Sequence, residues 1–175
     1  LADMECVSDT GVLHKYKRKS DNTLFSVQTL ITNDDMNQPQ FHPNILSLEN
    51  LSKFHHPNLA KYHGYALKSV EDQIHILIFL EDSEGALCDF IKDHEFTNEE
   101  ASSLAQELAD VLLFIDKATN TLPLYLTPSS VMVTKDPNNP NNHHFKVYRA
   151  LFFDNMGRVD GEDYKWMSPE LYERA

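Results

Sequence analysis

Cysteine is scarce in this chain, and negative charge outnumbers positive charge. The 175 residues include two cysteines, Cys6 and Cys88, far apart in the sequence, so neither a disulfide framework nor a cysteine-based zinc site is expected. Lys and Arg number 15 against 27 Asp and Glu, which gives a formal net charge of −12. This charge argues against nonspecific binding to nucleic acid or to an anionic membrane. It would favour a protein partner with a basic surface.

Long hydrophobic runs are also missing. The longest, over 74–80, is interrupted by His75 and is too short to cross a membrane. No signal peptide is visible, and together with the few cysteines this predicts a cytoplasmic setting. Hydrophobic residues still make up 41% of the chain, which is typical of a globular protein. The chain begins with Leu1 instead of Met, so we expect it to be an excerpt of a longer protein.

The first half of the chain has the pattern of strands with one helix. Two strand-like runs, 11–19 and 23–31, flank turn residues and predict an antiparallel hairpin. A short amphipathic helix is expected over 44–54. Strands are expected over 59–67 and 73–80, and the second is apolar enough to be a buried central strand.

After the last of these strands the hydrophobic period changes from two to 3.6. A short helix is predicted over 85–93 and a long one over 96–117, where Thr97 and Glu100 have the spacing of a capping box. The predicted buried face of the long helix consists of Ala101, Leu104, Ala105, Leu108, Leu112 and Ile115.

Short strands over 130–134 and 145–153 complete the predicted elements. Strands come first and helices later, and such segregation predicts an α+β protein in two lobes. We place these lobes at residues 1–81 and 82–175.

Several segments resemble parts of a protein kinase domain and follow the order of that family. They are HHPNLAKYHGYAL at 55–67, ILIFLEDSEGALCDFI at 76–91, TNEEASSLAQELADVLLFID at 97–116, LTPSSVMV at 126–133 and YKWMSPELYE at 164–173. The resemblance implies a kinase-like fold with a small β-rich N-terminal lobe and a mainly helical C-terminal lobe, the latter incomplete here.

The resemblance also shows which positions would carry phosphoryl transfer, and the first of these are changed. Cys6 and Ser8 stand where the first two glycines of the phosphate-binding loop belong, and Gly11 keeps the third. Gln28 stands at the lysine that pairs the phosphates, and Ser47 at the glutamate that pairs this lysine. A neutral glutamine cannot offset phosphate charge.

The catalytic positions in the second half are changed as well. Tyr125 replaces the aspartate base, and a tyrosine, with a reference pKa of about 10, cannot act as a carboxylate base near neutrality. Thr127 replaces the lysine of the catalytic loop and Ser130 its metal-binding asparagine. Arg149 replaces the metal-binding aspartate, and a guanidinium there would repel a metal ion. Phe79 aligns with the position that gates the pocket behind adenine, which a large ring would narrow.

Simpler interpretations stand beside these. Phe79 and Tyr125 could be ordinary packing residues, and Arg149 a half-exposed strand residue. The histidine pairs at 55–56 and 143–144 have no third ligand in register. No metal site and no cofactor are therefore expected.

A kinase-like frame that has lost its chemical residues is typical of a pseudokinase. We therefore expect no enzymatic activity, and a function as a protein-binding scaffold or allosteric regulator within a larger protein. Two alternatives stay open. One is a structural subunit of a large assembly; the other is an atypical nucleotide-binding kinase in which Gln28 and Arg149 contact phosphates without a metal.

Overall fold

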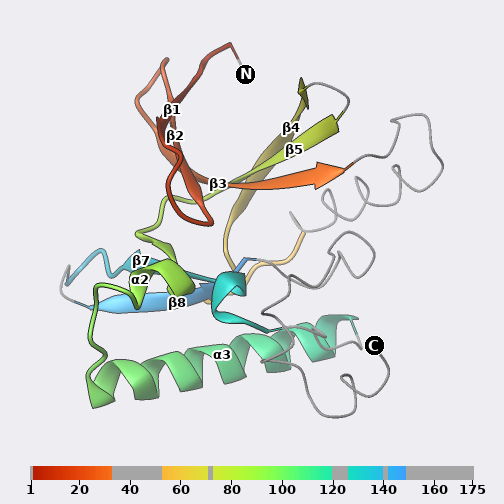
Figure 1. The fold of residues 1–175 in the computed structure, drawn as a ribbon. Coiled ribbons are helices and arrows are strands. Elements are labelled where there is room, and N and C mark those ends of the chain that lie inside the picture. Colours follow the sequence, from red (N-terminus) through yellow and green to blue (C-terminus); the bar gives the residue numbers. More distant parts are fainter. Residues whose placement is uncertain (1, 33–52, 71–72, 120–125, 140–141, 149–175) are drawn as a thin grey trace.

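The computed structural model describes residues 2–32, 53–70, 73–119, 126–139 and 142–148 (Figure 1). The elements are β1 (Met4–Ser8), β2 (His14–Arg18), β3 (Leu24–Thr32), β4 (Tyr62–Val70), β5 (Gln73–Leu80), β6 (Gly85–Ala86), α2 (Leu87–Phe90), α3 (Asn98–Thr119), the 3-10 helix η1 (Pro128–Ser130), β7 (Val131–Lys135) and β8 (His143–Val147).

The first five strands form one sheet in the order β1-β2-β3-β5-β4. The predicted antiparallel hairpin is confirmed, with β2 and β3 paired from His14↔Val27 to Lys17↔Leu24. Its turn places Asn22 at a φ of 60°, which asparagine tolerates better than most residues. The prediction of a buried interior strand at 73–80 is also confirmed, because β5 lies between β3 and β4.

β1 was not predicted. It pairs antiparallel with β2 at the edge of the sheet, and its three middle residues are exposed. An edge strand of this kind needs no apolar alternation, so the usual sequence signal for a strand is missing. The helix predicted over 44–54 lies almost entirely outside the described residues.

A second sheet has three strands in the order β6-β7-β8. The helix predicted over 85–93 is wrong in its first part, because Gly85 and Ala86 form β6 and pair with Val133 and Met132 of β7. Gly85 has a φ of +128°, which lies outside the helical region, and only the four residues of α2 are helical. The strands predicted over 130–134 and 145–153 correspond to β7 and β8, with the end of the second outside the described residues.

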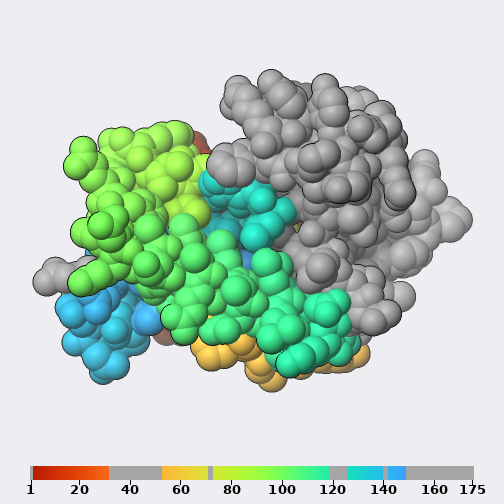
Figure 2. Space-filling model, turned by 90° about the horizontal axis from the view of Figure 1, so that it is seen from below, coloured from red at the N-terminus to blue at the C-terminus, as the bar shows by residue number. Residues whose placement is uncertain are grey.

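α3 begins with the predicted capping box. The Glu100 N–H donates to Thr97 Oγ1 at 3.1 Å, and the Thr97 N–H donates to Glu100 Oε2 at 3.0 Å. The helix runs below the second sheet in Figure 1 and forms much of the face seen in Figure 2. Its predicted buried face is partly wrong, since Ala101 and Ala105 are exposed whereas Val111 is fully buried against Val147 of β8. The position of β8 along the helix determines which residues are covered.

The segment that precedes β4 links the two sheets. The Val147 N–H donates to the Asn58 carbonyl oxygen at 2.9 Å, and the Ala60 N–H donates to the Val147 carbonyl oxygen at 2.9 Å. The Asn58 side chain also donates to the Phe145 carbonyl oxygen at 3.2 Å. β8 is thus held by α3 on one side and by this segment on the other.

The largest of the hydrophobic clusters crosses from one sheet to the other, and we call it the inter-sheet core. Its buried members are Leu13, Ile76, Ile78, Leu80, Ala86, Met132 and Tyr148. A separate cluster of Phe25, Val27 and Leu77 covers the opposite face of the five-stranded sheet. The described chain is therefore a mixed α+β protein, as predicted, with more strands than helices. None of its described helices is long and apolar enough to span a membrane.

Candidate functional site

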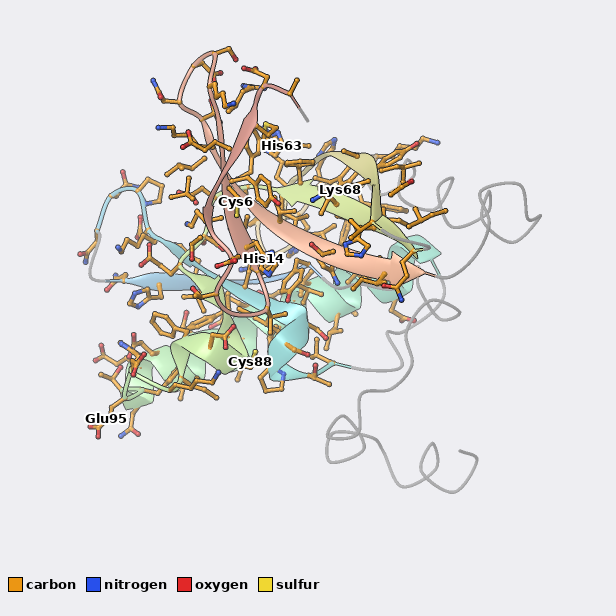
Figure 3. The ribbon with its side chains drawn as sticks, turned by 45° about the horizontal axis from the view of Figure 1, so that its top comes forward. Cys6, His14, His63, Lys68, Cys88 and Glu95 are labelled. Carbon is orange, nitrogen blue, oxygen red and sulfur yellow. The ribbon has the colours of Figure 1, made fainter. Side chains whose placement is uncertain are left out.

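The residues aligned with the phosphate-binding loop lie in β1 and in the turn between β1 and β2. Cys6 and Ser8 are in β1, and Gly11 is in the turn that follows, with a φ of +80°. Cys6 is exposed, and Figure 3 shows it on the hairpin, well separated from Cys88 on α2. Both cysteines are free thiols.

The turn is occupied by a carboxylate of the chain itself. Asp89 of α2 accepts a hydrogen bond on Oδ2 from the Val12 N–H at 2.7 Å. A Cβ added to Gly11 would lie 2.6 Å from the same oxygen and would displace it, and the positive φ also favours glycine. The Lys92 ammonium, together with the Val12 N–H, holds the pKa of Asp89 below its usual range despite partial burial. An ionised Asp89 would repel a phosphate at this turn.

Gln28 and Phe79 lie on opposite faces of the five-stranded sheet. Gln28 is buried and pairs with Ile78, whereas Phe79 pairs with Val27. Cross-strand partners share a face, so the placement of Phe79 in one cleft with Gln28 is wrong. Its ring instead contacts Tyr16 and Phe25, with centroids 6.1 and 6.0 Å apart. Leu80, paired with Ser26, is on the face of Gln28.

The connection from β5 to β6 is tied to its surroundings at several points. Lys15 of β2 donates to Asp82 Oδ1 at 2.5 Å and also to the Ser83 carbonyl oxygen. On the other side, Lys146 of β8 donates to Glu81 Oε2 at 2.8 Å. The buried hydroxyls of Ser26 and Ser83 are 2.7 Å apart. These hydrogen bonds thus attach the β1–β2 hairpin to the segment that joins the two sheets.

Apolar side chains fill the space beneath this hairpin. Leu13, which follows the turn, is 7% exposed, and Met132 of β7 is 0% exposed. Tyr148 completes the inter-sheet core, and its hydroxyl donates to the Ser129 carbonyl oxygen at 2.5 Å. These residues join the two sheets through apolar contacts.

Thr127, which caps η1, and Ser130, its last residue, are brought together, and both are nearly fully buried. Their hydroxyl oxygens are 3.1 Å apart, and Thr127 Oγ1 also lies 2.7 Å from Ser129 Oγ. The Ser130 N–H donates to the Thr127 carbonyl oxygen at 2.8 Å. These polar groups stabilise their own turn and form a capping box around η1.

The other predicted site residues, Ser47, Tyr125 and Arg149, lie outside the described residues. Among the predicted residues that are described, the structure brings Thr127 and Ser130 into contact. Gln28 is in β3 of the five-stranded sheet. Cys6, Ser8 and Gly11 are in the β1–β2 hairpin at the edge of the same sheet.

A different group of ionisable residues meets where α3 begins, and we call it the histidine–glutamate cluster. His94 Nε2 lies 2.9 Å from Glu100 Oε1, and His143 Nδ1 lies 3.1 Å from the same oxygen. All three side chains are partly buried. The Thr97 N–H, followed by His143 and His94, lowers the pKa of Glu100 to about 2 against the opposing effect of burial.

This cluster was not predicted from the sequence, where His143 was paired with its neighbour His144 and no third ligand stood in register. In the structure His94 and Glu100 lie next to His143, so the expected lack of further ligands is wrong. One part of the signal was visible, since the capping box fixed the position of Glu100. The pairing of β7 with β8, which brings His143 to the beginning of α3, has no counterpart in the local sequence.

No protein-family model matches the chain, and a search of curated proteins finds no similar one. The kinase-like relationship therefore stays a resemblance carried by the sequence segments.

Proposed function

We propose that this chain is a catalytically inactive, kinase-like domain of two lobes that acts in the cytoplasm by binding a protein partner. In this proposal it serves as a scaffold or allosteric regulator within a larger protein. The single observation that carries the proposal is the Asp89 carboxylate bound to the Val12 N–H at the turn aligned with the phosphate-binding loop.

Two further features support an inactive domain. Leu13, Met132 and Tyr148 pack together in the inter-sheet core, and in this proposal that packing leaves no room for adenine. The β1–β2 hairpin is also anchored through Lys15 to Asp82 and Ser83, whereas the glycine-rich loop of a working kinase closes over its substrate. An anchored hairpin suits a rigid binding surface better than it suits a catalytic cycle.

The acidic end of the molecule supports a partner with a basic surface. Asp93, Glu95 and Glu99 are exposed around the beginning of α3, and Glu95 lies at that extremity in Figure 3. With a net charge of −12, complementary charge would accelerate encounter and align such a partner.

Thermal unfolding in the presence of ATP tests the inactive state. We expect no change in Tm when ATP is added with or without Mg²⁺ or Mn²⁺. A bound ligand at about 100 times its Kd would stabilise the protein by about 2.7 kcal/mol. A metal-dependent rise in Tm followed by transfer of labelled phosphate would refute the proposal.

The Asp89→Ala variant separates the two physical reasons for the absence of binding. It removes the carboxylate from the turn and leaves the inter-sheet core in place. If the core alone excludes adenine, the variant will also show no shift with ATP. If ATP stabilises the variant but not the original chain, the carboxylate is the main obstacle.

Selection from a random peptide library tests the partner. We expect enrichment of peptides rich in Lys and Arg, with binding that weakens as salt is raised from 50 to about 500 mM because salt screens exposed charges. Substitution of Asp93, Glu95 and Glu99 by the corresponding amides should reduce binding. Selection of apolar or acidic peptides would contradict a basic partner.

A further inference from the structure

We propose that His94, Glu100 and His143 form a binding site for a zinc ion. Imidazole nitrogens and a carboxylate oxygen are ligands that zinc prefers, and two histidines with one glutamate make a known three-residue ligand set. The three ligand atoms, His94 Nε2, Glu100 Oε1 and His143 Nδ1, all lie within 4.8 Å of one another.

The separations of these atoms are close to those in a tetrahedral zinc site. With zinc–ligand bonds of about 2.0–2.1 Å, neighbouring ligand atoms are about 3.3 Å apart. Oε1 of Glu100 lies 2.9 Å from His94 Nε2 and 3.1 Å from His143 Nδ1. An ion would need only small movements, provided that each imidazole carries its proton on the other ring nitrogen.

The capping box orients the carboxylate for this role. Oε2 of Glu100 accepts hydrogen bonds from the Thr97 N–H at 3.0 Å and from the Thr97 hydroxyl at 3.1 Å. The other oxygen, Oε1, is thereby directed at both histidines.

Aromatic packing positions the two imidazoles. The ring of Phe90 packs against both, with centroids 4.5 Å from His94 and 4.9 Å from His143, and the two imidazoles are 5.2 Å apart. The Phe96 ring also packs against His94, with ring centroids 5.6 Å apart. The ligands are therefore held in place before an ion binds, and less ordering is needed on binding.

The ion would join three separate parts of the fold. His94 follows α2, Glu100 is in the first turn of α3, and His143 begins β8. Figures 1 and 2 both place the start of β8 on the same side of the molecule as the beginning of α3. The cluster lines a cavity of about 430 Å³ with polar neighbours such as Ser103 and Asn142, so a water or a partner side chain can supply the fourth ligand.

Calorimetric titration of the chelator-treated protein with ZnCl₂ tests the site. We expect one zinc ion per chain, and a rise in Tm of roughly 5–10 °C when free zinc is about 100 times Kd. Cobalt should bind in its place and give the visible absorption bands of four-coordinate Co²⁺. Mg²⁺ should not compete, since it prefers six oxygen ligands.

Single substitutions locate the ion. His94→Ala, His143→Ala and Glu100→Gln should each raise the zinc Kd by at least about 10- to 100-fold, the loss known for changes in residues that only support a metal ligand. Glu100→Gln keeps an oxygen that can accept the Thr97 N–H and so preserves the start of α3. His144→Ala is the matched control: it removes the next histidine, which lies 2.7 Å from Glu107 and outside the cluster, and should leave Kd unchanged.

Three results would overturn the proposal. They are the absence of stoichiometric zinc binding by the original chain, binding that is unaffected by all three cluster substitutions, and binding that is lost in His144→Ala. The Tm of each variant in chelator identifies any that fail to fold, and Glu100→Gln then decides the outcome. Failure here would leave the kinase-like proposal intact, because that proposal rests on Asp89 and on binding of ATP.

Discussion

In the region aligned with a nucleotide cleft, several polar side chains bond to neighbouring backbone or to one another, whereas at the beginning of α3 two imidazoles converge on one carboxylate oxygen atom. Thr127 and Ser130 close their own turn, and Asp89 binds the Val12 N–H. His94 and His143, by contrast, both contact Glu100 Oε1 at the surface. Positions that resemble a known motif are therefore not the positions at which ionisable side chains meet in this protein.

The largest effect expected on the cleft side comes from Met132→Ala. Met132 is fully buried in the inter-sheet core, so its truncation should lower the free energy of unfolding by about 2–5 kcal/mol. Urea unfolding measures this loss. Leu113→Ala on α3 is the control, because Leu113 is 52% exposed and its truncation should cost about 0.5 kcal/mol or less. If the two substitutions lowered the free energy of unfolding equally, the space between the sheets would not be packed, and the contrast between the two regions would be wrong.

An intermediate effect is expected from Gly11→Ala. The positive φ and the close Asp89 oxygen together should cost about 1–3 kcal/mol of unfolding free energy. Repeating the substitution in the Asp89→Ala background removes the clash and should recover part of that cost. Gly64→Ala is a useful reference, since Gly64 has a φ of +132° with no atom within 4 Å of an added Cβ. If the Asp89→Ala background recovers nothing, the carboxylate does not constrain the turn.

The smallest effect concerns the histidine–glutamate cluster and depends on pH. The pKa of Glu100 is about 2 in the folded protein against 4.5 ordinarily, so the stabilisation from its ionised form is present above pH 4.5 and is lost as pH falls through 2. In chelator, the stability difference between the original chain and Glu100→Gln should therefore shrink by roughly 1 kcal/mol or less between pH 6 and pH 2, because the interactions are partly exposed to solvent. A difference that is constant with pH would show that the carboxylate gains nothing from its neighbours.

Local sequence signals were sufficient for part of the fold. The hairpin, the interior strand β5 and the Thr97–Glu100 capping box were all predicted, because each depends on residues close together in the chain. β6 was mistaken for helix because its conformation comes from pairing with β7, about fifty residues later. The exposure of Ala101 and the burial of Val111 likewise follow from where β8 crosses α3.

The arrangement of the candidate site residues was harder to predict from the sequence than the fold. Alignment gave the positions of Gln28, Thr127 and Ser130, but the strand register that separates Phe79 from Gln28 emerges from three-dimensional pairing. The histidine–glutamate cluster combines residues 43 positions apart, His143 and Glu100, and no spacing rule connects them. Asp89 belongs to a segment that resembles a kinase. Its hydrogen bond with the Val12 N–H, however, depends on how the β1–β2 hairpin packs against α2.

The bond between Asp89 and Val12 also bears on what the protein can sense. The Val12 N–H in the turn after β1 is satisfied by a carboxylate of the same chain. Because Asp89 is part of the chain, its hydrogen bond with the turn does not depend on the nucleotide concentration. If the domain is the scaffold proposed above, we therefore expect it to present the same hairpin surface to its partner at high and at low nucleotide concentration.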